Sequence, residues 1–256
     1  MSFRDQSVPF QMVDGPGPGR QFTTRRRARL GDATPKGRLR LDAVARYLQD
    51  VANDDTRDAD WSDPHWWVVR RTVIDVHEFP AYLQEIDLTT WCGGVGSHWA
   101  ERRTRISATD GTVLIDAAAL WVHVDEATLQ PSRVPEDVAA LLLESAAGRQ
   151  VNARLILREK EFARENTVMP QDWPLRFSDF DAVGHMNNAA YWEIVEDSLA
   201  NKPGLRAPLR AVVEHVVQIE QGQTVQRLVT TLIEDIELLV SVDNTTHAAM
   251  WCGTNP

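Results

Sequence analysis

Residues 176–197, RFSDFDAVGHMNNAAYWEIVED, decide how this chain folds, because they predict a strand, a polar turn and a helix in immediate succession. Within seven residues the turn brings together a carboxylate, a glycine, an imidazole and a side-chain amide, at Asp181, Gly184, His185 and Asn187. The first backbone N–H groups of a helix have no partner inside it, so they add hydrogen-bond donors at the same place. This combination predicts a site that polarises a carbonyl group.

The helix after the turn is predicted to be amphipathic. Its core-facing positions recur at intervals of three and four residues, at Tyr191, Ile194, Val195, Ser198 and Leu199. Asn187 or Asn188 suits the N-cap, because a short side-chain oxygen can accept one of the unpaired N–H groups of the first turn. Polar residues before a helix are also common as simple caps and turn formers, so a purely structural role for the motif is the alternative.

The rest of the chain predicts one pattern of secondary structure that occurs twice. In the first half, a strand at 21–30 and a helix at 41–52 precede four extended runs, at 66–76, 85–92, 98–107 and 112–124. In the second half, a strand at 172–178 and the helix of the motif precede four more, at 209–219, 224–233, 236–242 and 246–252. The order β-α-β-β-β-β in each half predicts an α+β protein of two tandem domains, each with an antiparallel sheet wrapped around a central helix.

Composition sets the predicted boundaries. Residues 1–20 end in GPGPG, which favours a flexible leader. Residues 21–135 then form the first domain, residues 136–151 a helical connector, and residues 152–256 the second domain, which carries the motif. Each half alone is small, so pairing the two buries more apolar surface per residue.

The motif resembles the acyl-acyl-carrier-protein (acyl-ACP) thioesterases of plants and bacteria, which have two fused hot-dog domains. That family carries Asp-x-Asn-x-His-x-Asn-Asn and then a Tyr three residues on. This chain matches the pattern at Asp181, His185, Asn187, Asn188 and Tyr191. It departs at Val183, where the family has a catalytic Asn. In the first half the resemblance rests on GRLRLDAVARYLQDVA at 37–52, on TWCGGVGSHWAERRTRI at 90–106, and on the run that ends at 125.

The resemblance implies a role for each polar residue of the turn. Asp181 acts as the general base or orients the attacking water. His185 and the N–H groups around Gly184 polarise the thioester carbonyl, and Asn187 supports the turn. No metal or other cofactor is expected.

A Glu from a later strand completes the polar set in related thioesterases. The spacing places Gln218 at that position in this chain, where it would hold the same water as the turn carboxylate. Strand alternation puts Glu214, Gln218 and Glu220 on one face of a strand predicted at 209–219, so all three remain open.

The two halves differ where the chemistry is expected. At the place of Asp181 the first half is predicted to carry Asp32, but its turn, ATPKG, supplies no His or Asn. One polar site per chain is therefore expected, in the second half, with Asn188 and Tyr191 of the motif contacting the substrate. The first half is expected to supply the walls of an acyl tunnel, with Trp66 and Trp67 in substrate contact. Trp61 and Trp91 are further candidates for that wall, and core packing is the alternative for each Trp.

Charge and composition exclude several classes of protein. The net charge of −10 argues against nucleic acid as the main partner. No run of about 18 apolar residues suits a membrane span, and the first residues do not suit a signal peptide, so a cytoplasmic protein without a membrane partner is expected. Two cysteines without metal-ligand spacing, Cys92 and Cys252, are expected to be reduced and buried.

Basic residues concentrate in the segment 20–46. This segment contains nine Lys and Arg residues, its two end residues included, against two Asp residues. This patch suits an acidic carrier protein or the phosphate of its pantetheine arm, although a solvated face is the simpler interpretation of each arginine. The expected function is hydrolysis of acyl-ACP thioesters to free fatty acids in fatty acid biosynthesis. A non-hydrolytic acyl-thioester binding protein is the alternative, because of Val183 and Gln218. A homodimer is left open beside the monomer.

Overall fold

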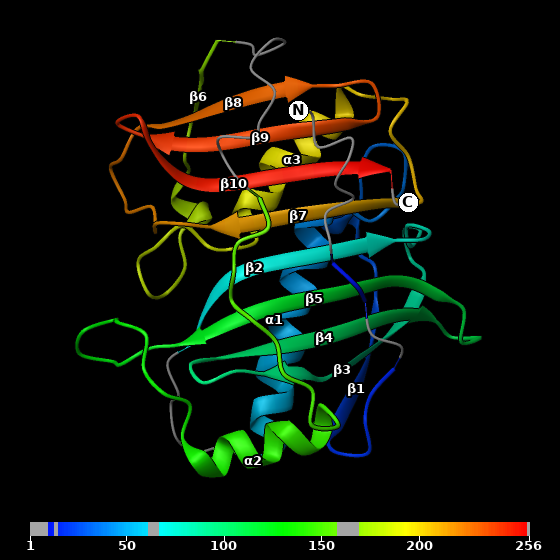
Figure 1. The fold of residues 1–256 in the computed structure, drawn as a ribbon. Coiled ribbons are helices and arrows are strands. Elements are labelled where there is room, and N and C mark those ends of the chain that lie inside the picture. Colours follow the sequence, from blue (N-terminus) through cyan, green and yellow to red (C-terminus); the bar gives the residue numbers. More distant parts are fainter. Residues whose placement is uncertain (1–9, 13–14, 61–66, 158–168, 255–256) are drawn as a thin grey trace.

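The computed structural model describes residues 10–12, 15–60, 67–157 and 169–254. Their strands form one ten-stranded sheet in the order β1-β3-β4-β5-β2-β7-β10-β9-β8-β6, and every neighbouring pair is antiparallel (Figure 1). The first half of the chain supplies one side of this sheet and the second half supplies the other.

The elements of the first half are β1 (Gln21–Arg27), α1 (Leu41–Asp58), β2 (Trp67–Val76), β3 (Glu85–Val95), β4 (Trp99–Ala108) and β5 (Val113–His123). Helix α2 (Glu136–Ser145) follows. Those of the second half are β6 (Gln171–Trp173), α3 (Ala190–Ala200), β7 (Leu209–His215), β8 (Val225–Thr231), β9 (Asp235–Val242) and β10 (Thr245–Thr254). The predicted hot-dog architecture, a helix embraced by an antiparallel sheet in each half, is confirmed.

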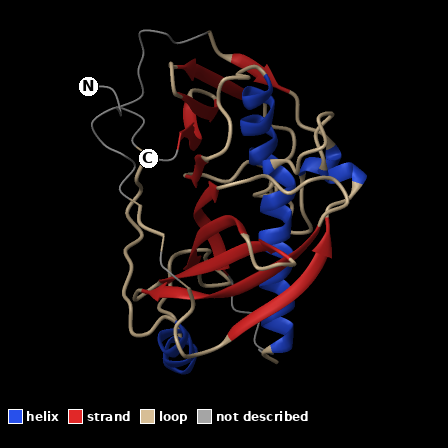
Figure 2. Ribbon diagram, turned by 90° about the vertical axis from the view of Figure 1, so that its right-hand side faces the viewer, coloured by secondary structure: helices blue, strands red, loops and turns tan. Residues whose placement is uncertain are grey.

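Helices α1 and α3 lie against the same face of the sheet and contact each other (Figure 2). The apolar spacing of α1 explains its place, since Leu41, Val44, Leu48 and Val51 fall on one side and are all buried. One apolar cluster contains residues of both helices and of strands from both halves. The two helices therefore share a single core.

The two halves are joined by backbone pairing of β2 with β7, which places Val73 opposite Val212 at the centre of the sheet. The sequence predicts one sheet in each half; the structure shows that the two sheets are one. Two ion pairs flank this centre, on the face away from α1 and α3. Arg210 binds Asp75 through two hydrogen bonds of 2.6 and 2.7 Å, and Arg71 lies 3.9 Å from Glu214.

Segments outside the strands cover this outer face. The backbone N–H groups of Ile156 and Leu157, in the connection from α2 to β6, donate to the Glu214 carboxylate at 2.8 and 2.9 Å. Phe10 lies under the guanidinium groups of Arg71 and Arg103, 5.2 and 5.1 Å from its ring centre. In the segment predicted as a flexible leader, residues 1–20, Gln11 and Met12 contact Arg103, and Gly17 donates its N–H to the carbonyl of Ser145. The flexible leader stays a prediction.

The strands predicted at 172–178 and 209–219 end early, each for a local reason. The strand predicted at 172–178 ends at Trp173, because Asp179 accepts hydrogen bonds from the backbone and side chain of Arg176 and stabilises a short 3-10 turn, Phe177–Asp179. The strand predicted at 209–219 ends at His215. Both following N–H groups, at 216 and 217, donate to the carbonyl of His247, which breaks the ladder.

The Arg210–Asp75 pair gives a test of the join between the halves. Arg210→Met leaves the Asp75 carboxylate, which is 3% exposed, without this cationic partner, so we expect the free energy of unfolding to fall by roughly 3–5 kcal/mol in urea titrations. Arg25→Met is the matched control, because Arg25 pairs with Asp87 at the exposed edge, and its unfolding midpoint should stay close to that of the unsubstituted protein. Equal midpoints for the two variants would contradict this role.

Candidate active site

The turn before α3 is held in shape by its own backbone. The N–H of Asp181 donates to the carbonyl of His185 and the N–H of Gly184 donates to that of Asp181, both at 3.0 Å. Gly184 has φ of 92°, a conformation that costs glycine little and other residues more. The Oδ1 atom of Asp181 accepts the N–H of Val183 at 3.0 Å, so this carboxylate also caps the turn. Asp181 and His185 are both half-buried at the ends of one tight loop.

The two asparagines after the turn do different things. Asn187 accepts the N–H of Ala189 through Oδ1 at 2.8 Å and donates its own N–H to the carbonyl of Asp179 at 2.8 Å. It therefore fixes the path of the chain into α3. Asn188 instead lines a small cavity of about 20 Å³, together with Gln49 of α1 and Trp121 of β5. The motif thus meets the helix of the first half.

The segment after β7 runs beside the turn. His185 forms an antiparallel bridge with Glu220, and Met186 donates its N–H to the carbonyl of Ile219 at 2.8 Å. Gln218 is exposed at the start of this segment. Glu214 lies elsewhere, because its carboxylate is bound by the connection on the outer face of the sheet. Burial raises the pKa of Glu214, against the effect of the two N–H groups that it accepts. The predicted common face of Glu214, Gln218 and Glu220 is wrong, since the strand ends at His215.

The first half contains the same turn, bond for bond. Thr34 donates its N–H to Arg38 as Asp181 does to His185, and Gly37, with φ of 81°, donates to Thr34 as Gly184 does to Asp181. The 3-10 turn Leu30–Asp32 precedes it as Phe177–Asp179 precedes the second turn. Asp32 is therefore the counterpart of Asp179, and the predicted equivalence of Asp32 with Asp181 is wrong. Thr34 and Arg38 stand where the second half has Asp181 and His185.

This repeat also bears on the position of Gln218. In the first half, Leu39 donates its N–H to Pro80 as Met186 does to Ile219, which makes Phe79 the counterpart of Gln218. The guanidinium of Arg38 lies 4.2 Å from the centre of the Phe79 ring. Arg38 and Phe79 are therefore the counterparts of His185 and Gln218, and the catalytic role of Gln218 stays a prediction.

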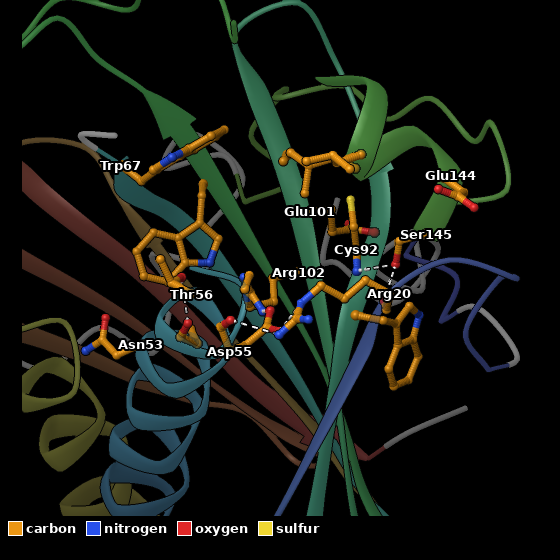
Figure 3. Close-up of a pocket in the computed structure, with 17 residues that line it drawn as sticks. Arg20, Asn53, Asp55, Thr56, Trp67, Cys92, Glu101, Arg102, Glu144 and Ser145 are labelled. Carbon is orange, nitrogen blue, oxygen red and sulfur yellow. Dashed lines mark hydrogen bonds and ion pairs between the residues drawn. The ribbon is translucent and has the colours of Figure 1, made fainter. Parts of the chain in front are cut away.

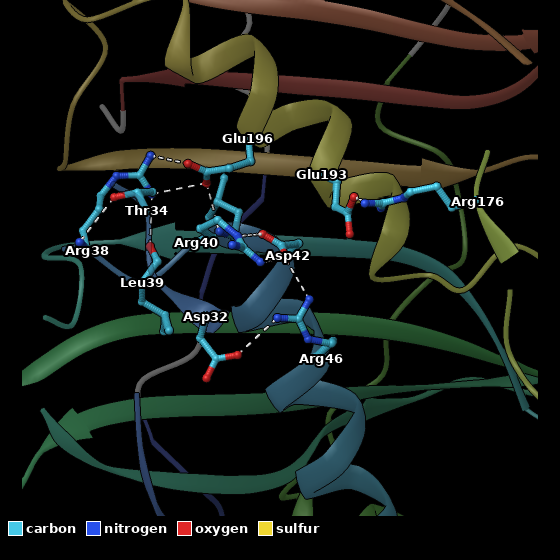
Figure 4. Close-up of polar contacts among 11 residues, drawn as sticks. Asp32, Thr34, Arg38, Leu39, Arg40, Asp42, Arg46, Arg176, Glu193 and Glu196 are labelled. Atoms are coloured by element: carbon cyan, nitrogen blue, oxygen red, sulfur yellow. Dashed lines mark hydrogen bonds and ion pairs between the residues drawn. The ribbon is translucent and has the colours of Figure 1, made fainter. Parts of the chain in front are cut away.

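Thr34 and Arg38 of the first half replace the acid and the imidazole, and Arg38 forms an ion pair with α3 of the second half. Arg38 binds both carboxylate oxygens of Glu196 in α3, at 3.2 and 2.6 Å, and the N–H of Leu41 donates to the same carboxylate at 3.0 Å (Figure 4). These bonds tie the first turn to the second helix. The first half keeps the shape of the turn without its acid or its imidazole.

A cavity of about 680 Å³ lies in the first half, between the end of α1, the sheet and α2 (Figure 3). Trp67, Trp91 and Trp121 line it. Trp61 and Trp66 fall outside the described residues. Trp121 and Arg102 belong to the walls of both this cavity and the small cavity at Asn188, so the two spaces adjoin. The volume of the larger cavity is in the range of small-molecule binding sites.

Polar groups occupy one side of the large cavity. Arg102 and Arg20 bind the carboxylate of Asp55 at 2.5 and 2.9 Å. The thiol of Cys92 also lines the space, and burial raises its pKa to about 11. A thiol with this pKa stays protonated near neutral pH, so Cys92 is unsuited to act as a nucleophile.

Tyr191 and His215 pack together in the core behind the turn. Their rings meet edge to face with centroids 4.7 Å apart, and Tyr191 is 2% exposed. Burial raises the pKa of Tyr191. Burial, and to a smaller extent the charge of Arg70, lower the pKa of His215 to about 4. The assignment of Tyr191 to substrate binding stays a prediction.

The described part of the chain contains no cluster of three or more His, Cys, Asp or Glu residues suited to a metal ion. Within the same residues, no helix is both long and apolar enough to cross a membrane.

The arrangement of sheet, helices and turn defines a double hot-dog protein of the thioesterase type. The family model of the acyl-ACP thioesterase N-terminal domain matches residues 19–142, and that of the C-terminal domain matches residues 163–249. The chain belongs to the acyl-ACP thioesterase family.

Individual relatives agree with this assignment. An uncharacterized protein of Mycobacterium tuberculosis, Rv2001, is 32% identical over 220 residues, or 86% of each chain. The chloroplastic acyl-[acyl-carrier-protein] hydrolase FATB3 of Cuphea viscosissima is 27% identical over 49% of this chain and 31% of its own length. A putative oleoyl thioesterase of Lactobacillus plantarum has the same fold, with a TM-score of 0.78 and 19% identity over 93% of this chain and 98% of its own. The 12:0-ACP thioesterase of Umbellularia californica also has this fold, with a TM-score of 0.71 and 17% identity over 91% of this chain and 96% of its own.

His215 generates a prediction about pH and stability. Its ring stays neutral in the folded protein down to about pH 4, whereas the unfolded chain takes up a proton near pH 6.5. The stability due to the neutral ring is therefore complete above pH 6.5 and is lost as the pH falls towards 4, by about 3 kcal/mol.

His215→Phe keeps an aromatic ring against Tyr191 and removes the titration. In urea unfolding at pH 7 and pH 4, this variant should lose about 3 kcal/mol less than the unsubstituted protein over that interval. His77→Phe is the control, since His77 is exposed. The same pH dependence in all three proteins would show that the pKa of His215 does not differ between the folded and unfolded states.

Proposed function

We propose that this protein hydrolyses fatty acyl-ACP thioesters and releases the free fatty acid. The observation that carries the proposal is the turn at 181–187, which presents a half-buried acid and a half-buried imidazole. The next residue, Asn188, lines a small cavity that shares Arg102 and Trp121 with the cavity of about 680 Å³. The shared family with the acyl-ACP hydrolases supports the same reaction.

In the proposed mechanism Asp181 takes a proton from water, and the water oxygen bonds to the thioester carbonyl carbon. Gln218 holds the same water through its side-chain amide. His185 donates to the carbonyl oxygen as negative charge develops on it. The N–H groups of Val183 and Gly184, which the resemblance assigned to the same oxygen, are already bound within the turn. The C–S bond then breaks, and the thiolate of the carrier's pantetheine arm takes up the proton. The acyl chain occupies the first-half cavity, with Asn188 at its entrance and Trp67 on its wall.

A cleft of about 670 Å³ on the first half suits the acidic carrier protein. Five arginines line it, namely Arg25, Arg26, Arg27, Arg29 and Arg46, against three acidic residues, Asp32, Asp50 and Glu85. Several of these arginines are paired with the acids around them, so the proposed attraction is a property of the whole cleft. The buried, free cysteines suit a reducing compartment, which is the cytoplasm in this proposal.

A non-hydrolytic acyl-thioester binding protein is the second candidate, and one observation favours it. Val183, which stands where the family has a catalytic Asn, is 60% exposed and apolar, and its N–H occupies one oxygen of the Asp181 carboxylate. A protein of this kind would bind acyl-ACP and return it intact after long incubation, whereas the hydrolase would release fatty acid and free thiol.

The role of the acid can be tested with Asp181→Asn. The amide still accepts a hydrogen bond from the turn but cannot take a proton, so we expect the rate of acyl-ACP hydrolysis to fall at least about 100-fold. Asp172→Asn, on the exposed strand β6, is the matched control and should retain full activity. Equal rates for both variants would remove Asp181 from the mechanism.

The role of the cavity can be tested by filling it. Thr56 lies on its α1 wall, so in Thr56→Trp we expect kcat/KM to fall at least about 10-fold for the longest acyl chain that the unsubstituted protein accepts, and to change little for short chains. Arg57→Trp places the same ring on the exposed side of α1 as a control. A uniform loss over all chain lengths would show that the acyl chain lies elsewhere.

A further inference from the structure

The catalytic turn and the first helix come together at the interface between the two halves. Helices α1 and α3 are related by the internal repeat, with a constant offset from Leu41 to Asn188 and from Gln49 to Glu196. Buried positions coincide under this offset: Val44, Leu48 and Val51 match Tyr191, Val195 and Ser198. The repeat therefore gives each contact between one turn and the opposite helix a counterpart.

One member of this pair of contacts is seen in full detail. Glu196 of α3 accepts the N–H of Leu41 at 3.0 Å and two hydrogen bonds from Arg38. The counterparts of these three residues are Gln49, Asn188 and His185. Gln49 and Asn188 line the same small cavity, so α1 and the second turn lie close together, as the repeat predicts.

We propose that Gln49 is a positioning residue that orients the imidazole of His185 across the interface between the halves. Its Oε1 atom accepts the N–H of Asn188, as Glu196 accepts that of Leu41. Its Nε2 atom donates to the unprotonated ring nitrogen of His185, where Arg38 donates to Glu196 in the first half. This arrangement fixes the proton on the other ring nitrogen, which then points to the thioester carbonyl.

The chemistry of an amide explains why the two helices differ at this position. Glu196 receives only donors, from Arg38 and Leu41, so a carboxylate suits it. In the proposed arrangement Gln49 meets one donor and one ring nitrogen that needs a donor, and an amide offers both an acceptor and a donor. A carboxylate at 49 would favour a protonated, charged imidazole, which cannot keep the assigned tautomer. Gln49 is half-buried between Ala45 and Leu48, so packing restricts its side chain.

The inference rests on the proposed hydrolysis, and Gln49→Glu tests it by a measurement that needs no activity. We expect NMR titration to show the pKa of His185 raised by about one unit in this variant, because a negative charge replaces the neutral amide. The other ionisable groups on the elements packed there are unchanged, namely Asp181, Glu220, Arg46, Asp50 and Arg102, which lines the same small cavity as Gln49. Gln130→Glu, in an exposed loop, adds the same charge as a control and should leave that pKa unchanged.

Kinetics of the full chain then separate positioning from binding. In Gln49→Leu we expect kcat for acyl-ACP hydrolysis to fall about 10-fold with KM little changed, since the imidazole loses its orientation and the acyl cavity is untouched. An unchanged pKa of His185 in Gln49→Glu together with an unchanged kcat in Gln49→Leu would overturn the inference. If the unsubstituted protein hydrolyses no thioester, the proposed function fails, and the NMR titration alone decides whether Gln49 contacts His185.

Discussion

The antiparallel pairing of β2 with β7 is the constraint on which the rest of the structure depends. It turns two small curved sheets into one and brings α1 and α3 into a common core. Two buried ion pairs flank its centre, one between Arg210 and Asp75 and one between Arg71 and Glu214. Buried ion pairs add little net stability over apolar contacts, but a shifted register would leave their charges unpaired. They therefore specify the register at which the halves meet, and with it the distance between each turn and the opposite helix.

That register decides where chemistry can occur. The first turn reaches across to the helix of the other half, and in our proposal the second turn does the same. Where the first turn meets α3, the contact is an ion pair between Arg38 and Glu196, which stabilises the interface. Where the second turn meets α1, the turn carries an acid, an imidazole and an amide, and Asn188 lines a small cavity together with Gln49. The same backbone geometry thus stabilises the interface at the first turn and, in our proposal, supports catalysis at the second.

Much of this could be predicted from the sequence, because helix periodicity and the repeated element order are local signals. The motif and the large tryptophan content of the first half also pointed to a turn and a cavity wall, and Trp67 does line the cavity. No local pattern in the sequence indicates that the two sheets join, since β2 and β7 are far apart in the chain. The end of β7 depends on a distant carbonyl, that of His247, and the counterpart of Asp32 became clear only from matching hydrogen bonds. Gln49 resembles any polar helix residue until α1 is seen beside the second turn.

The joining of two hot-dog units in one chain has an evolutionary consequence. In a dimer of identical subunits every substitution appears in both symmetry-related sites, so neither can change alone. A covalently duplicated unit is free of that restriction, and each copy can accumulate its own residues. One diverged pair is Arg38 with Glu196, an ion pair that stabilises the interface between the copies. In our proposal the equivalent pair is His185 with Gln49, so that the second copy serves the reaction instead.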